Sequence, residues 1–203
     1  MYSMSRAWPV NDVDPDAPVI DNARRVLAVR IAEFYSFQPI VSHPELSEAL
    51  HDMRISAKRL RYTLELFRSQ FGKAGERQIE RVKAIQELLG ALHDHDVRID
   101  LIGEELSQLM VEQSRKTRSD IADASPNELA AIAAAALRPP PDDPRRGLIA
   151  LLGREHAGRR AAYAQLRELW DTYSGDGMRR DLVELSVTPL ANRAGAAARI
   201  SPT

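Results

Sequence analysis

The chain has 203 residues and a formal net charge of −1, and its 44% hydrophobic and 28% charged residues exclude a disordered or generally basic protein. It contains no cysteine, which excludes disulfides, thiolate metal sites and cysteine nucleophiles and is consistent with a cytoplasmic protein. No apolar run approaches the ~18 residues of a membrane-spanning helix, and the N-terminus lacks the basic and apolar regions of a secretory signal, so no membrane partner is expected.

Aromatic residues make up only 5% of the chain, and alanine and leucine are abundant, which favours helices over strands. The apolar spacing predicts an all-α protein, a bundle of five to six helices with long antiparallel members. We expect a flexible leader over residues 1–15, one helical domain over 16–188 and a flexible tail over 189–203. In chain order, the predicted helices cover residues 17–36, 43–69, 76–113, 127–137, 145–173 and 178–187.

Local signals predict where these helices begin and end. The sequence SHPE, which begins at Ser42, matches a capping box with proline in the first turn and places the start of the second helix there. The glycines of FGKAG, at 71–75, predict a break before the third helix. RPPPDDP, at 138–144, predicts a rigid loop, because consecutive prolines cannot continue a helix.

Positive charge is concentrated in two segments, although the net charge is close to zero. Residues 51–83 contain nine Lys and Arg against four Asp and Glu, and residues 145–167 contain six against one. An anionic partner responds to the local concentration of charge rather than to the total. These two segments are therefore the candidates for an anion-binding site.

The stretch HDMRISAKRLRY, placed on a helix at about 100° per residue, gathers four cationic side chains on an arc about 80° wide. We call this set the basic stripe: His51, Arg54, Lys58 and Arg61. A larger apolar arc on one side of it consists of Met53, Ala57, Leu60, Leu64 and Phe67, and a smaller one on the other side of Ile55, Tyr62 and Leu66. The residues opposite the stripe are predicted to face solvent: Asp52, Ser56, Arg59 and Thr63.

Two interpretations of the basic stripe remain open. If both apolar arcs pack, the stripe lines a groove between helices, and its like charges need acidic partners or an external anion. If the smaller arc is exposed, the stripe is the solvated edge of an amphipathic helix.

Two other predicted helices carry related groups. One face of the third predicted helix contains Lys83, Gln86, Gly90 and His93, and the glycine indicates either a close approach or a kink. One face of the fifth contains His156, Arg159, Arg160, Tyr163 and Arg167. The polar side of an ordinary amphipathic helix has the same pattern, so this second face is the weaker candidate.

HDHDV, at 93–97, contains the residue types that bind divalent metals. On a helix only His93 and Asp96 share a face, and no second cluster supplies further ligands. The alternative is that Asp94 or Asp96 pairs with a neighbouring arginine. The sequence also lacks phosphate-binding glycine loops and the nucleophile elbow of hydrolases. We therefore expect no metal site, no cofactor and no catalytic residue.

The two central motifs resemble the CHAD domain family. Its first motif, H-x-x-R-x-x-x-[RK]-R-L-R, is matched from His51 to Arg61, and its second, L-G-x-x-x-D-x-D-V, from Leu89 to Val97. A looser similarity extends over residues 17–188. The resemblance implies a helical fold with a basic groove or channel that binds inorganic polyphosphate, and a location at polyphosphate granules. By position it assigns the polyphosphate contacts to His51, Arg54, Lys58, Arg61, Lys83, His93, His156, Arg159 and Arg160.

The chain departs from this family in having one clear copy of the first motif, whereas family members usually contain two similar halves. A homodimer would supply the second basic helix by two-fold symmetry. The leading interpretation is non-catalytic polyphosphate binding. Two alternatives stay open: a metal-dependent phosphohydrolase that uses the HDHDV residues, and a helical scaffold or nucleic-acid-binding protein. Few aromatic side chains are available for base stacking, which disfavours nucleic acid as the partner.

Overall fold

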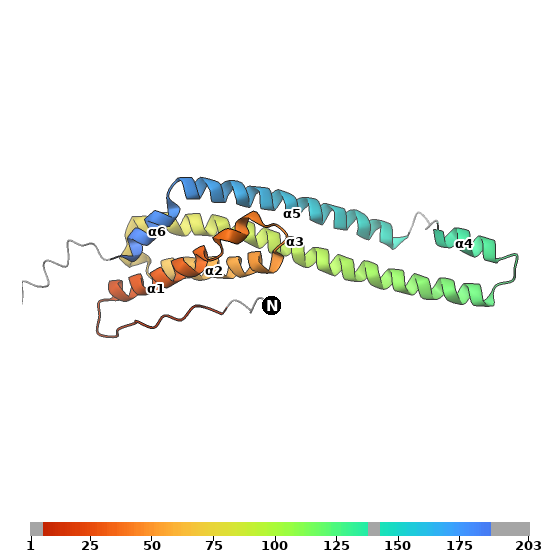
Figure 1. Cartoon of the computed structure of the whole chain (residues 1–203), viewed down its shortest axis with the longest axis horizontal. Coiled ribbons are helices and arrows are strands. Elements are labelled where there is room, and N and C mark those ends of the chain that lie inside the picture. The colour runs from red at the N-terminus through yellow and green to blue at the C-terminus, as the bar shows by residue number, and fades with distance from the viewer. Residues whose placement is uncertain (1–5, 138–142, 188–203) are drawn as a thin grey trace, which may run out of the picture. The chain divides into compact units, whose positions relative to one another are not determined.

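The computed structural model describes residues 6–137 and 143–187, and within them it contains six α-helices and no strand, which confirms the predicted all-α class (Figure 1). The elements are α1 (Val19–Tyr35), the 3-10 helix η1 (Gln38–Ser42), α2 (Ser47–Leu66), α3 (Arg68–Asp123), α4 (Leu129–Leu137), α5 (Pro144–Gly175) and α6 (Met178–Ser186). None of these helices has a stretch that is long and apolar enough to cross a membrane. The predicted tail and most of the proline loop lie outside the described residues.

The fold divides into two compact units. Among the described residues, unit 1 consists of 6–93 and 162–187, and unit 2 consists of 94–137 and 143–161. Both boundaries fall inside long helices, one in α3 and one in α5, so the chain passes between the units as continuous helix.

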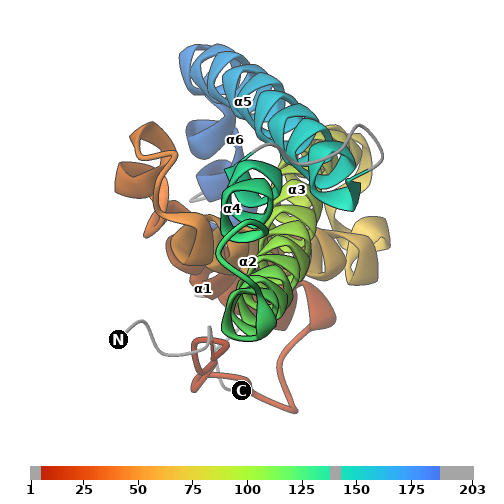
Figure 2. The same ribbon diagram turned by 90° about the vertical axis from the view of Figure 1, so that its right-hand side faces the viewer.

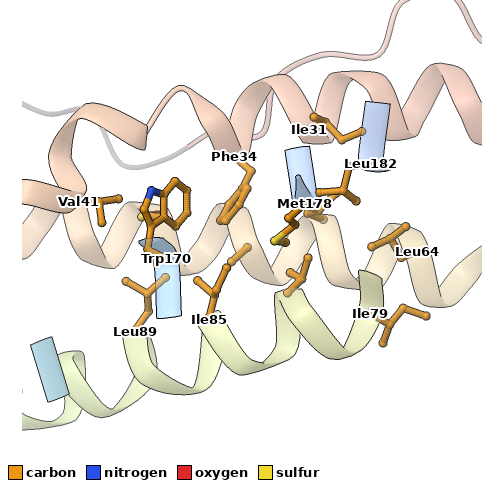
Figure 3. Packing of buried hydrophobic residues seen from close by; sticks show 14 of the residues in the cluster. Ile31, Phe34, Val41, Leu64, Ile79, Ile85, Leu89, Trp170, Met178 and Leu182 are labelled. Atoms are coloured by element: carbon orange, nitrogen blue, oxygen red, sulfur yellow. The ribbon is translucent and has the colours of Figure 1, made fainter. Parts of the chain in front are cut away.

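The core of unit 1 forms where the apolar faces of five helices meet. Figure 3 shows side chains from α1, α2, α3, α5 and α6 converging on one cluster, with Trp170 beside Phe34 at 5.7 Å between ring centroids. On α1 the buried residues follow the helical spacing that the sequence predicts: Ala23, Leu27, Ile31 and Phe34. Each large apolar side chain that is fully buried contributes about 1.5–3 kcal/mol, so this cluster accounts for much of the stability of unit 1.

A buried carboxylate joins α1 to α2 within unit 1. Glu33 is only 2% exposed and accepts hydrogen bonds from two arginines, Arg59 at 2.6 Å and Arg30. Removing a carboxylate from water is costly unless it is paired and hydrogen-bonded, and two guanidinium groups satisfy this requirement. The pairing fixes which face of α2 packs against α1.

The predicted capping box at Ser42 is wrong. Ser42 is the last residue of η1, and its hydroxyl donates back to the carbonyl of Pro39 instead of forward to a helix N-terminus. The helix α2 begins only at Ser47, with Leu46 at the N-cap and no side-chain cap. The Ser42 hydroxyl is therefore engaged in a hydrogen bond within the 3-10 helix and does not cap α2.

The break predicted at FGKAG is a kink rather than a loop. The first residues of α3 are already helical from Arg68, and Gly72 alone leaves the helical region, at φ 55° and ψ −148°. A positive φ is easily accessible only to glycine, so this residue absorbs the change of direction. The same helix runs to Asp123, about ten residues beyond the predicted end at 113, whereas α4, α5 and α6 lie close to their predicted ranges.

Unit 2 contains the second part of α3, the short α4 and the first part of α5. Figure 2 shows α4 next to α3, and Figure 1 shows it beside the last turns of that helix. Ile102 of α3 is buried there, and other apolar side chains of the unit are half-buried: Leu106, Leu109, Leu148 and Leu152. Two ion pairs also join α3 to α5 in this unit, Arg98 with Glu155 and Arg159 with Asp96.

Candidate anion-binding site

The basic stripe lies on α2, and the packing of the helix in unit 1 sets its orientation. The larger apolar arc is buried as predicted, with Met53, Ala57, Leu60 and Leu64 all in the core cluster. The smaller arc behaves differently, since Tyr62 is 48% exposed and Leu66 is 76% exposed. The stripe is therefore packed on one flank and open on the other, and α2 does not enclose it between two buried arcs.

The face predicted to meet solvent, opposite the stripe, is mostly buried. Ser56 and Thr63 are buried, and Arg59 is held by Glu33 of α1. This prediction was wrong because packing covers this side of α2: Arg59 pairs with the buried carboxylate of α1, Thr63 donates to the backbone carbonyl of Arg59, and the Ser56 hydroxyl is buried without a hydrogen-bond partner among the described residues. Polar residues indicate the solvent-facing side of a helix only when neighbouring helices leave that side uncovered.

Arg54 lies at the centre of the basic stripe and is half-buried against α3. Its Nε lies 3.6 Å from the point where a side chain at Gly90 would place its Cβ, so the guanidinium packs over the glycine backbone. The helix α3 is regular at Gly90, so the glycine does not mark a kink, and a Cβ at this position would make ordinary van der Waals contact with Arg54. Arg54 makes no ion pair with a carboxylate among the described residues, and its Nε has no hydrogen-bond acceptor there.

A histidine pair lies at the N-terminal end of the stripe. The Nδ1 atoms of His51 and His93 are 3.1 Å apart and their ring centroids 4.3 Å apart, so one ring donates a hydrogen bond and the other accepts it. Burial is the main cause that lowers the pKa of His51, and the charges of His93 and Arg54 lower it further, against a smaller opposing effect of Asp52. His51 is therefore harder to protonate in the free protein than an ordinary histidine.

The C-terminal end of the stripe combines two cations with an aromatic ring that the sequence interpretation did not assign to the site. Lys58 is exposed, with its Nζ 5.6 Å from the centroid of the Tyr62 ring, and the Arg61 guanidinium lies 4.9 Å from the same centroid. The i,i+4 spacing of Lys58 and Tyr62 is the signal that predicts such a contact. Glu65, which continues the stripe, is 3.7 Å from Arg61, a loose contact for an ion pair.

Lys83, also predicted to belong to the site, lies on α3 in unit 1 and is exposed. Among the described residues, neither Lys58 nor Lys83 makes an ion pair with a carboxylate. Gln86, one turn along α3, has a buried Oε1 without a hydrogen-bond partner in the described part of the chain. Unit 1 thus presents positive charge on α2 and α3 that its own carboxylates leave largely unneutralised.

The remaining predicted residues, His156, Arg159 and Arg160, belong to α5 in unit 2. Arg159 is held by Asp96 of α3 through its Nε, as the arginine-pairing alternative predicts, while His156 and Arg160 are exposed. Farther along α5, in unit 1, Tyr163 donates a hydrogen bond of 2.8 Å to the carbonyl of Val41. The basic face of α5 is therefore partly structural.

The histidine and aspartate residues of HDHDV do not share a common site, because each lies in a different environment. His93 contacts His51, His95 lies 2.7 Å from the Glu155 carboxylate, Asp96 accepts from Arg159 and Asp94 is exposed. Arg98 also donates to Glu155, at 2.8 Å, and these charge-assisted contacts lower the pKa of that carboxyl group. Within the described residues no group of three or more histidine, aspartate or glutamate side chains is arranged to hold a metal ion.

Comparison with curated proteins gave no match, and comparison with solved structures gave none either. The family model of the CHAD domain matches residues 6–103. The match contains the whole basic stripe, Lys83 and the histidine pair, and it ends before α4 and α5, to which the looser similarity had been expected to extend. This stretch of the chain belongs to the CHAD domain family.

Proposed function

We propose that the protein binds inorganic polyphosphate, without hydrolysing it, through the basic stripe of unit 1. The observation that carries the proposal is the unneutralised charge of Arg54 and Lys58 beside Arg61, whose only carboxylate contact among the described residues is loose. A flexible polyanion supplies acceptors for forked arginine donors and releases counterions when it binds. The stripe spans about 15 Å of helix, long enough for several successive phosphate groups.

The CHAD family assignment supports the same ligand, and the geometry of the HDHDV residues favours binding over hydrolysis. Three of the four histidine and aspartate residues, His93, His95 and Asp96, contact other side chains of the protein, so they are occupied in holding the fold. Binding would bring the protein to polyphosphate granules in the cytoplasm. His156 and Arg160 of unit 2 would form a separate set of contacts, which the double variant His156→Ala/Arg160→Ala tests by itself.

The experiment that tests this function is a titration of the purified protein with long-chain polyphosphate at several salt concentrations. Three to four phosphate contacts predict a slope of about −2 to −3 for the logarithm of affinity against the logarithm of salt, as for a single-stranded polyanion. Single-stranded RNA should compete weakly, and orthophosphate should not be released, with or without added divalent metal. Salt-independent binding, or equal affinity for RNA, would contradict the proposal.

Acidification is expected to strengthen polyphosphate binding. In the free protein the pKa of His51 is below its ordinary value of 6.5, and a bound polyanion raises it because the protonated ring meets negative charge. Affinity should therefore rise, by up to roughly tenfold, as the pH falls through the range below 6.5. The variant His51→Asn should bind with nearly the original affinity at pH 7.5 and lose much of this increase.

The free protein responds to acid in the opposite direction. A lowered folded-state pKa means that the unfolded chain takes up the proton first, so His51 reduces stability as the pH falls below 6.5. Polyphosphate should consequently protect the protein from unfolding more strongly at pH 5.5 than at pH 7.5. A pH-independent affinity in the original protein would show that His51 is not in contact with the ligand.

A further inference from the structure

The second part of α3, in unit 2, carries an exposed stripe with the spacing of a coiled-coil seam. The residues follow one another at alternating steps of three and four, and all are exposed. We call them the outer stripe: Leu101, Glu104, Gln108, Val111, Arg115 and Arg118. Alternating steps of three and four keep residues on one line of a helix that pairs with another helix.

The outer stripe is separate from the face that α3 uses inside unit 2. On the opposite side of the same helix, Ile102 is buried and Leu106 and Leu109 are half-buried. Leu101 and Val111, in contrast, leave 60% and 51% of their surface exposed. The helix therefore has one apolar side that its own unit covers and a second, mixed side that it leaves open.

The acidic and basic residues of the outer stripe are separated toward its two ends. Glu104 lies near its N-terminal end, and Arg115 and Arg118 lie at its C-terminal end. Among the described residues none of the three makes an ion pair. A second copy in parallel register would place like charges on each other, whereas an antiparallel copy places the acidic end of each helix against the basic end of the other.

We infer that the outer stripe is the contact surface for a second copy of this chain, with the two α3 helices antiparallel. A two-fold axis midway between Gln108 and Val111 sets Glu104 of one copy opposite Arg115 of the other, twice per dimer. The same axis sets Leu101 opposite the aliphatic stem of Arg118, which covers the leucine while its charge stays in water. Four stripe positions thus find complementary partners in one register.

This inference does not depend on polyphosphate binding, because it uses only α3 residues of unit 2. The paired segment is about 26 Å long and its core is partly polar, so the dimer is expected to be weak and to weaken further with salt. Sedimentation at ~100 µM protein should detect it at low ionic strength and show mostly monomer at roughly 0.5 M salt. A monomer under both conditions would overturn the inference.

Charge reversal tests the register. Glu104→Arg and Arg115→Glu should each abolish the dimer, since each variant sets like charges opposite each other. An equimolar mixture of the two variants should dimerise again, because every cross pair is then complementary. The double variant Glu104→Arg/Arg115→Glu should also dimerise. All of these residues are exposed, and circular dichroism checks that the helices are retained; failure of both the mixture and the double variant would contradict the pairing.

The absence of cysteine in the chain allows a direct test of direction. Leu101→Cys and Arg118→Cys variants, mixed and oxidised, should form a disulfide-linked heterodimer in preference to either homodimer. Parallel helices would instead give Leu101→Cys homodimers. Preferential homodimer formation, or random cross-linking that salt does not change, would overturn the antiparallel arrangement.

Discussion

Replacing Arg54 and Lys58 together by glutamate is expected to weaken polyphosphate binding by at least about 100-fold. Each lost charge-assisted contact removes roughly 1.5–3 kcal/mol, and the new carboxylates add repulsion. The fold should be preserved, because Lys58 is exposed and Arg54 makes no ion pair with a described carboxylate. Isothermal titration or fluorescence anisotropy with labelled polyphosphate measures the effect.

A matched control separates the site from the general charge of the protein. Lys73→Glu/Arg77→Glu changes the net charge by the same amount on α3 of unit 1, where both residues are exposed and lie about 100° around the helix from Lys83. This variant should bind within roughly threefold of the original protein. If both double variants lose affinity equally, attraction is governed by total charge and the basic stripe is not the site.

Replacing Glu33 by alanine is expected to cause the largest loss of stability among single carboxylate substitutions in unit 1. The substitution leaves Arg30 and Arg59 facing each other without the buried anion that holds them. Breaking a buried pair in this way costs about 3 kcal/mol, which corresponds to a fall of roughly 6–12 °C in melting temperature for a chain of this length. Thermal unfolding followed by circular dichroism measures it.

Two comparisons show whether this cost arises from the arginines. Glu168→Ala removes an exposed carboxylate from α5 and should change the melting temperature by no more than about 1–2 °C. The Glu33→Gln variant keeps a hydrogen-bond acceptor of the same shape, so its melting temperature should fall less than that of the Glu33→Ala variant. Equal melting temperatures for the Glu33→Ala and Glu168→Ala variants would mean that the buried pair does not stabilise the fold.

Much of the secondary structure was predictable, because helix formation depends on apolar spacing and on local breakers. The ranges expected for α1, α4, α5 and α6 lie within a few residues of those observed. The boundary that failed, at Ser42, is a place where a 3-10 turn competes with an ordinary helix end, whereas the break predicted at FGKAG is present as the kink at Gly72. Whether a turn or a helix forms at such a residue depends on how the surrounding side chains pack, and a short sequence motif contains no information on that packing.

The sequence by itself determined the helical class, the cationic positions of the basic stripe and its larger apolar flank, because side-chain type and helical period are local properties. Only the tertiary structure decided what each polar group contacts. It placed Ser56 and Thr63 in the interior, paired Arg59 with Glu33, and brought His51 to His93 across 42 positions of sequence. Those outcomes depend on which faces of separate helices meet, and the free energy of desolvating charge then selects the pairs.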